Sequence, residues 1–178
     1  MRALPPGVVP QEPGPGQESV WDYPRPPRLE VARRRVRVLV DGAVLADAPA
    51  GSGLAWRVLE TSHPPTYYLA PAAVDGALLR PAEGESWCEW KGVAGYLDVL
   101  GPDGSLAAAR AAWRYPRPTP SFADLAGAVS LYPGCAPGRV LCLLDEEEVR
   151  AQPGGFYGGW VSDDVVGPFK GGPGSRGW

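Results

Sequence analysis

The sequence predicts a mainly β protein: a compact antiparallel barrel-like or two-sheet domain with one or two short helices and extended terminal arms rich in glycine, proline and aromatic residues. Three observations predict this fold. The 178 residues include 24 Gly and 22 Pro, which disfavour long regular helices. Residues 35–48, RVRVLVDGAVLADA, alternate in hydrophobicity with a period of two. Turn sequences recur at short intervals between the other apolar runs.

The clearest predicted element is a β-hairpin over residues 35–48. Val36, Val38 and Val40 share one strand face, and Asp41-Gly42 supplies a two-residue turn. Residues 54–62 predict the next strand, because its apolar residues also alternate. This strand places four side chains on one face: Leu54, Trp56, Val58 and Glu60.

The following segments predict shorter elements. Residues 71–81 predict a single helical turn bounded by Pro71 and Pro81. Residues 87–116 predict a pair of strands closed by the turn GPDG. Residues 119–129 predict a short helix with Thr119 or Ser121 near its N-cap, and residues 138–145, GRVLCLLD, predict one more strand.

The two ends of the chain differ from its body in composition. Residues 1–18 predict a flexible tail, since Pro, Gly and Gln dominate there, and residues 19–178 predict a single β-rich domain. The last part of the domain, about residues 145–178, is rich in glycine yet carries several aromatic rings. We expect it to be an arm that wraps across the domain with these rings as anchors. The need to bury the same rings also favours a homodimer.

Charge and cysteine content limit the expected partners. A net charge of −3 and a pI of about 5.2 argue against a general nucleic-acid partner. The arginines from Arg25 to Arg37 predict a solvated edge strand, with a phosphate-bearing ligand or partner as the alternative. Cys88, Cys135 and Cys142 form no CxxC pair, so with a single histidine we expect no metal, and no motif predicts a cofactor. The free thiols and the lack of a membrane-spanning apolar run predict a cytoplasmic protein without a membrane partner.

The candidate site centres on His63, the only histidine in the chain. The two prolines after it favour extended backbone and hold the imidazole with little freedom at the end of a strand. Glu60 needs a partner if it is partly buried, and His63 or Lys91 is the expected one. Cys88 and Lys91 face opposite ways in a regular strand, so a bulge or turn is needed to bring both into one cavity. These residues also have ordinary structural interpretations: His63 as a hydrogen-bonding histidine, Cys88 as a buried thiol and Lys91 as a surface charge.

Four phrases of the sequence resemble a known family. They are ETSHPPTYYL, CEWKG, AAWRYPRPTPSFADL and LYPG, in this order. Together they resemble the bacterial and fungal proteins called domain of unknown function 427 (DUF427), also carried under a nucleotidyltransferase-like label, from roughly Trp21 to the C-terminus. The resemblance implies a compact, mainly antiparallel β domain. Leu97 stands where that family more often has a tryptophan, which implies a different pocket wall.

These groups predict a metal-free enzyme that performs cyclisation, dehydration, isomerisation or hydrolysis on a small organic molecule in an aromatic-lined pocket. The expected catalytic residues are His63 as general acid or base, Glu60 to orient it, a tyrosine (Tyr67, Tyr68 or Tyr115) as an oxyanion donor, Lys91, and Cys88 as a pocket thiol or nucleophile. The expected substrate-binding residues are Trp56, Tyr68, Trp90, Tyr96, Trp113 and Tyr115.

The alternative is a non-catalytic module that binds a small molecule in the same pocket. Nucleotidyl transfer is a lesser alternative, because it needs clustered carboxylates to hold magnesium. The acidic run at residues 145–148 is contiguous, so it predicts a solvated turn instead.

Overall fold

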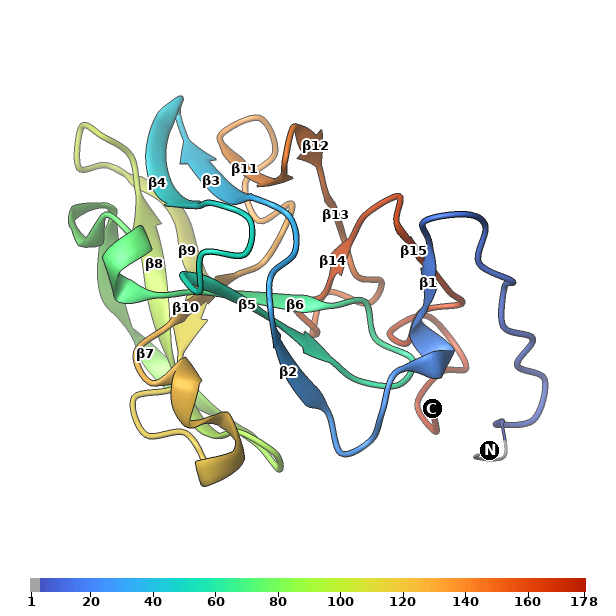
Figure 1. Ribbon diagram of the computed structural model, residues 1–178. Helices are drawn as coiled ribbons and strands as arrows, with labels where there is room; N and C mark the ends of the chain where they lie inside the picture. Colours follow the sequence, from blue (N-terminus) through green and yellow to red (C-terminus); the bar gives the residue numbers. More distant parts are fainter. Residues whose placement is uncertain (1–3) are drawn as a thin grey trace.

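The structure, a computed structural model, describes residues 4–178 and is built on two antiparallel sheets (Figure 1). The larger sheet has seven strands, in the order β2 (Arg28–Val31), β5 (Ala55–Leu59), β6 (Thr66–Leu69), β10 (Val129–Leu131), β9 (Leu106–Arg114), β8 (Gly92–Leu100) and β7 (Leu79–Cys88). The smaller sheet has four, in the order β12 (Glu147–Glu148), β11 (Val140–Leu144), β3 (Val36–Val40) and β4 (Ala43–Ala48). The predicted mainly β, two-sheet domain is confirmed, but the sheets do not close into a barrel.

The remaining elements are short. Two pairs of two-residue strands lie in the terminal segments: β1 (Glu18–Ser19) with β15 (Val165–Val166) joins the two segments, and β13 (Arg150–Ala151) with β14 (Trp160–Val161) lies within the C-terminal one. The helical segments are 3-10 helices: η1 (Val20–Asp22), η2 (Pro71–Ala73), η3 (Gly76–Leu78) and η4 (Pro120–Leu125).

Most elements lie close to the residue ranges that the sequence predicted for them. The β3–β4 hairpin turns at Asp41 and Gly42, whose φ angles of 47° and 83° fit the two-residue turn expected there. The single helical turn predicted over residues 71–81 is instead two 3-10 helices, and Pro81 lies inside β7. This strand is at the edge of its sheet and pairs irregularly after Pro81, which is where a strand tolerates proline.

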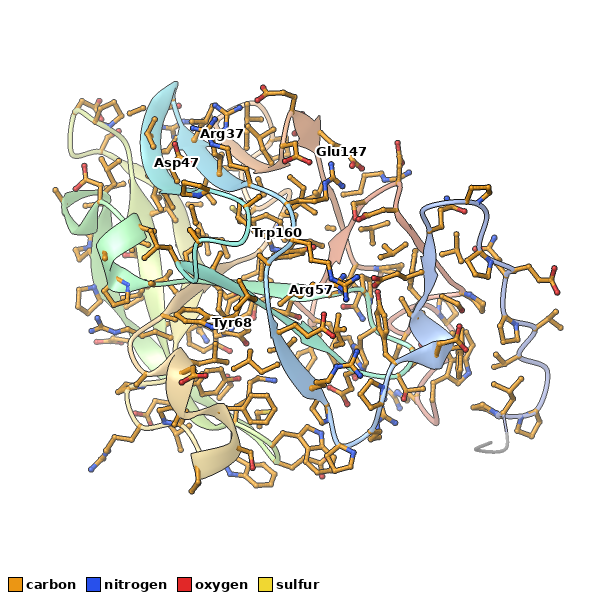
Figure 2. All side chains as sticks on the ribbon, viewed as in Figure 1. Arg37, Asp47, Arg57, Tyr68, Glu147 and Trp160 are labelled. Atoms are coloured by element: carbon orange, nitrogen blue, oxygen red, sulfur yellow. The ribbon has the colours of Figure 1, made fainter. Side chains whose placement is uncertain are left out.

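The arginine-rich segment was predicted as a solvated edge strand, and for β3 this is wrong. β3 lies between β11 and β4, so it has a hydrogen-bonded neighbour on each side. Its charged side chains, and those just before it, pair with acidic residues that are distant in sequence, and Figure 2 labels Arg37, Asp47 and Glu147 from three different pairs. The ion pairs are Arg34 with Asp145 and Glu147, Arg35 with Asp47, and Arg37 with Glu146.

The seven-stranded sheet buries side chains on both of its faces. One face packs on the four-stranded sheet, with Leu69 and Leu131 against Val36 and Val38 in a common core. The other face carries a second cluster that includes Tyr68, Trp113, Tyr115 and Phe122. Because side chains alternate along β6, Tyr67 points into the first core and Tyr68 into the second cluster.

The two ends of the chain contact each other and the larger sheet. The amide of Gln11 donates to the carbonyl of Gly167 at 2.8 Å, and the amide of Glu18 to that of Asp164 at 2.8 Å. In the C-terminal arm, Trp160 is fully buried, and its Nε1 donates to the Leu131 carbonyl at 3.0 Å. No helix within residues 4–178 is long and apolar enough to cross a membrane.

Candidate functional site

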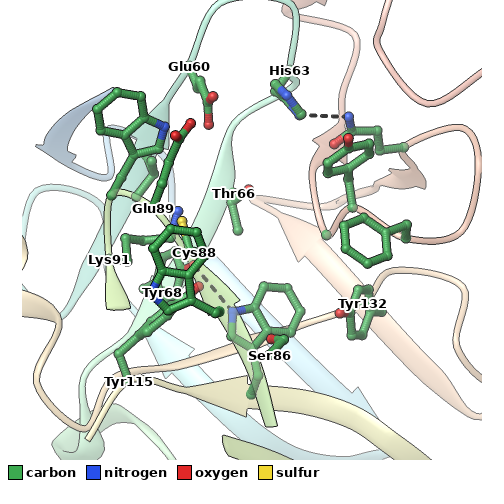
Figure 3. A pocket seen from close by; sticks show the side chains of 18 of the residues that line it. Glu60, His63, Thr66, Tyr68, Ser86, Cys88, Glu89, Lys91, Tyr115 and Tyr132 are labelled. Carbon is green, nitrogen blue, oxygen red and sulfur yellow. Dashed lines mark hydrogen bonds between the residues drawn. The ribbon is translucent and has the colours of Figure 1, made fainter. Parts of the chain in front are cut away.

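A cavity of about 390 Å³, here called the site cavity, opens on the face of the larger sheet that carries Tyr68 (Figure 3). Its walls come from β5, β6 and the turn between them, the end of β7 with the following turn, β8, β9, the residue after β10, and the C-terminal arm. Nine of the residues named from the sequence line it: Glu60, His63, Tyr68, Cys88, Trp90, Lys91, Tyr96, Trp113 and Tyr115.

The β7–β8 turn brings Cys88 and Lys91 into the same cavity. β7 ends at Cys88 and β8 begins at Gly92, so Lys91 sits in the turn and not in a regular strand. Thr119 fastens this turn from the segment before η4: its hydroxyl donates to the Trp90 carbonyl at 2.5 Å and its amide to the Lys91 carbonyl at 3.2 Å. The turn that is needed to bring Cys88 and Lys91 into one cavity is therefore present.

Lys91 is a buried residue whose side chain has no acidic partner within the described residues 4–178. The residue is 8% exposed, and its Nζ lies 5.8 Å from the ring centroids of both Tyr115 and Phe122. Within residues 4–178, Nζ makes no ion pair and no hydrogen bond, although ten arginines of the same part of the chain are ion-paired. Aromatic faces stabilise a cation only in part, so this ammonium leaves a charge to be neutralised at the cavity wall.

His63 is held in one orientation by Gln152, which is 3% exposed. The amide of Gly159 donates to Gln152 Oε1 at 3.1 Å, and Gln152 Nε2 donates to the Lys170 carbonyl at 2.8 Å, so the side-chain amide cannot be reversed. Gln152 Nε2 also lies 3.0 Å from His63 Nδ1 (Figure 3), and it can only donate there. Nδ1 therefore accepts, which places the proton of the neutral imidazole on Nε2.

The environment of His63 favours the neutral imidazole. Burial lowers the pKa of His63 from 6.5 to about 3, and the positive charges of Lys170 and Arg25 act in the same direction. The ring also packs edge-on against Tyr157, with centroids 4.7 Å apart. Because Nδ1 is occupied and Nε2 carries a proton, this imidazole is placed to donate a hydrogen bond into the site cavity near neutral pH.

Glu60 pairs with Arg25, and not with His63 or Lys91 as predicted. Arg25 Nη2 lies 3.0 Å from Glu60 Oε1, and both side chains are about four-fifths buried. The contact between Glu60 and His63 is confined to the backbone, where the His63 amide donates to the Glu60 carbonyl at 3.0 Å. Gln152, rather than Glu60, therefore orients the imidazole.

Phenols and indoles form the inner wall of the site cavity. Trp113 Nε1 donates to the Tyr68 hydroxyl at 3.3 Å, and the Trp113 ring packs on Tyr132 with centroids 4.4 Å apart. Burial raises the pKa of the Tyr68 and Tyr115 hydroxyls. Both hydroxyls therefore keep their protons near neutral pH.

Two predicted site residues and one predicted wall residue lie outside the site cavity. Tyr67 is 3% exposed and packs on Trp160, with centroids 5.1 Å apart, on the opposite face of the sheet. Trp56 packs at the edge of the Tyr68 cluster without lining the cavity. Leu97 belongs to the core between the sheets, because it alternates with the cavity residue Tyr96.

Several lining residues were not named from the sequence as site residues: Glu89, Tyr132, Gln152, Tyr157 and Lys170. Tyr132 lies in the phrase LYPG and Glu89 in CEWKG, two of the phrases that resemble the family, so the surrounding sequence indicated their positions. Gln152 carried no such signal, because its role depends on a contact between residues 89 apart in sequence. Within the described residues, no group of three or more His, Cys, Asp or Glu side chains is placed to hold a metal ion.

The sequence of the chain matches a known family across most of this site. Residues 28–141 match the family described as domain of unknown function (DUF427). The chain belongs to this family. No curated protein matches the sequence.

The DUF427 segment supplies most of the site cavity but not all of it. Glu60, His63, Cys88, Lys91 and Trp113 lie within residues 28–141. Other groups come from outside the matched residues: Arg25, Gln152, Tyr157, Gly158 and Lys170. In this DUF427 chain, residues outside the matched segment therefore hold the two polar groups that the segment provides: Gln152 holds the His63 imidazole, and Arg25 pairs with the Glu60 carboxylate.

Proposed function

We propose that the site cavity is the active site of an enzyme that performs acid–base chemistry on a small organic molecule carrying an anionic group. The observation that supports this most is the Lys91 ammonium, 8% exposed in the cavity wall and without an acidic partner in residues 4–178. A buried charge is costly unless it is paired. A carboxylate or phosphate on the ligand would supply the missing counter-charge.

The other polar groups divide into donors and acceptors. His63 Nε2–H and the hydroxyls of Tyr68 and Tyr115 are donors that can stabilise negative charge developing on a ligand oxygen. The carboxylates of Glu60 and Glu89 are the proton acceptors of the same cavity. Glu60 would take a proton from a carbon next to a carbonyl group. The electron pair of the broken C–H bond would form a C=C bond, and the π pair of the C=O bond would move onto the carbonyl oxygen facing the donors.

A neutral imidazole is suited to this role, because it polarises a carbonyl without first giving up a proton. Isomerisation, dehydration and cyclisation can each begin with such a proton transfer. The proposal therefore keeps the acid–base chemistry expected from the sequence but assigns proton removal to a carboxylate.

The alternative is a binding module without catalysis, and one observation favours it. Glu60 is engaged by Arg25, and His63 is engaged by Gln152. Both groups could thus serve only to shape a cavity that binds the ligand through Lys91.

The experiment uses a panel of small keto and hydroxy carboxylic acids, each paired with its neutral amide. We expect calorimetry to show that acids bind and amides do not. K91M should weaken acid binding by about tenfold or more, since it removes a charged partner, whereas K91R should retain binding. E60Q should keep affinity within about tenfold but abolish conversion of the bound acid, followed by mass spectrometry.

Two outcomes contradict the proposal in different ways. If acids and amides bind equally well, or if acids bind the wild type and K91M equally well, the ligand is not recognised through an anionic group at Lys91. Tight binding without conversion of any acid by the wild-type protein would favour the binding module.

A further inference from the structure

A second cavity of about 510 Å³ adjoins the site cavity. The two share part of their lining: Tyr96, Tyr132, Gln152, Phe156 and Tyr157. The two cavities therefore lie on either side of the same few side chains, one of which, Phe156, is 72% exposed. A ligand longer than the site cavity could therefore continue into the second cavity along the tyrosine rings.

A bulge in β9 forms one side of the second cavity. Leu97 pairs with Ala112 and Val99 with Ala108, so residues 109–111 lie opposite the single residue Asp98. All three bulge residues line the second cavity.

The backbone at Arg110 is held in an uncommon conformation. Its φ is 50°, in the left-handed region that non-glycine residues rarely adopt. The Arg110 amide donates to Asp98 Oδ1 at 2.9 Å, and Arg80 Nη2 lies 2.8 Å from Asp98 Oδ2. This arrangement redirects the Arg110 side chain away from the regular alternation of the strand, and such local strain is often found next to binding sites.

The Arg110 guanidinium lies over the ring of Tyr96, 4.4 Å from the centroid. Tyr96 belongs to the shared wall, so the cation sits beside the wall that the two cavities have in common. In residues 4–178 the guanidinium has no acidic partner, unlike Arg34, Arg35 and Arg37. It is therefore oriented by an aromatic face and free to bind an anion.

We propose that the second cavity is a subsite in which Arg110 binds a second anionic group of the same ligand. The proposal rests on the proposed function, in which Lys91 binds the first anionic group. The ligand class is an elongated organic molecule with an acidic group at each end and an apolar middle that lies along the aromatic shared wall.

The test uses straight-chain dicarboxylic acids of increasing length and the monocarboxylic acid of each length, titrated by calorimetry. In the wild-type protein, dicarboxylates of one length should bind about tenfold more tightly than the matched monocarboxylate. R110M should remove this advantage and leave monocarboxylate binding unchanged. Methionine is chosen because, unlike glycine, it keeps a side chain at the strained backbone position.

The matched control is R114M, which removes the same charge from an exposed arginine of the same strand that lines neither cavity. R114M should keep the dicarboxylate advantage. If no dicarboxylate binds more tightly than its monocarboxylate, or if R110M and R114M weaken binding equally, the subsite is overturned. If the subsite is overturned but K91M still weakens binding, the proposed function stands without the subsite. If K91M leaves binding unchanged, both the subsite and the proposed function are overturned.

Discussion

Arg57 shows how much a single residue can depend on contacts that are remote in sequence. It is 4% exposed on β5, and its Nη1 and Nη2 bind Glu18 at 2.9 and 3.0 Å while Nη2 also binds Glu30 at 3.0 Å. The alternation of residues 54–62 places Arg57 opposite the apolar stripe, which suggests an exposed side chain. It is buried because β1 and β2 bring two carboxylates over it.

The same contacts make stability depend on pH. Burial raises the pKa of Glu18 and Glu30, but the hydrogen bonds and positive charge of Arg57, together with those of neighbouring groups, lower the pKa of each by more, so both lie below the usual 4.5. The folded state then binds fewer protons than the unfolded state around this pH. The stabilisation is complete above about pH 4.5 and is lost as the pH falls through the folded pKa values.

We therefore expect R57M to lower the free energy of unfolding by about 1.5–3 kcal/mol at neutral pH, since charged hydrogen bonds are lost. It should also reduce the loss of stability on acidification, measured by urea unfolding from neutral to acidic pH. R150M is the control, because the Arg150–Asp163 pair is exposed and its removal should change stability by about 0.5 kcal/mol or less. An R57M protein as stable as R150M would contradict this account.

At the scale of elements, local sequence was sufficient for the β3–β4 hairpin and insufficient for the C-terminal arm. The hairpin is encoded by alternation and by Asp41-Gly42, which act over neighbouring residues. The arm has neither pattern, and its conformation follows from packing on distant strands. At Gly158, a Cβ atom would overlap the Trp113 ring, so only glycine allows the arm this close to the cavity wall.

G158A should therefore push the arm or the Trp113 ring out of place. We expect a loss of about 1–3 kcal/mol in the free energy of unfolding, and changed tryptophan fluorescence in the folded protein. G172A is the matched control in the same arm, because a Cβ there meets no atom within 4 Å. It should change stability by about 1 kcal/mol or less, and equal effects of the two substitutions would argue against the close approach.

At the scale of the whole molecule, the site cavity exists because the C-terminal arm packs over one face of the larger sheet, while Arg25 from the N-terminal segment pairs with Glu60. The sequence indicated Glu60 and His63 in one uncommon phrase and Cys88 and Lys91 in another. It also indicated the aromatic rings of Trp113 and Tyr115. It did not indicate Gln152 or Arg25, because those contacts depend on how the terminal segments lie over the sheet. The homodimer expected from the aromatic arms stays a prediction, although Trp160 is buried within its own chain.

The central claim is that the assembled cavity presents preorganised donors to an anionic ligand, with His63 as a neutral Nε2–H donor. His63 is the only histidine, so its two ring nitrogens give unambiguous signals in a long-range ¹H–¹⁵N correlation spectrum of the labelled protein. With a pKa of about 3, the account predicts the Nε2–H tautomer alone, unchanged from about pH 8 to about pH 5. A titration with a midpoint near the ordinary value of 6.5, or a proton on Nδ1, would contradict it.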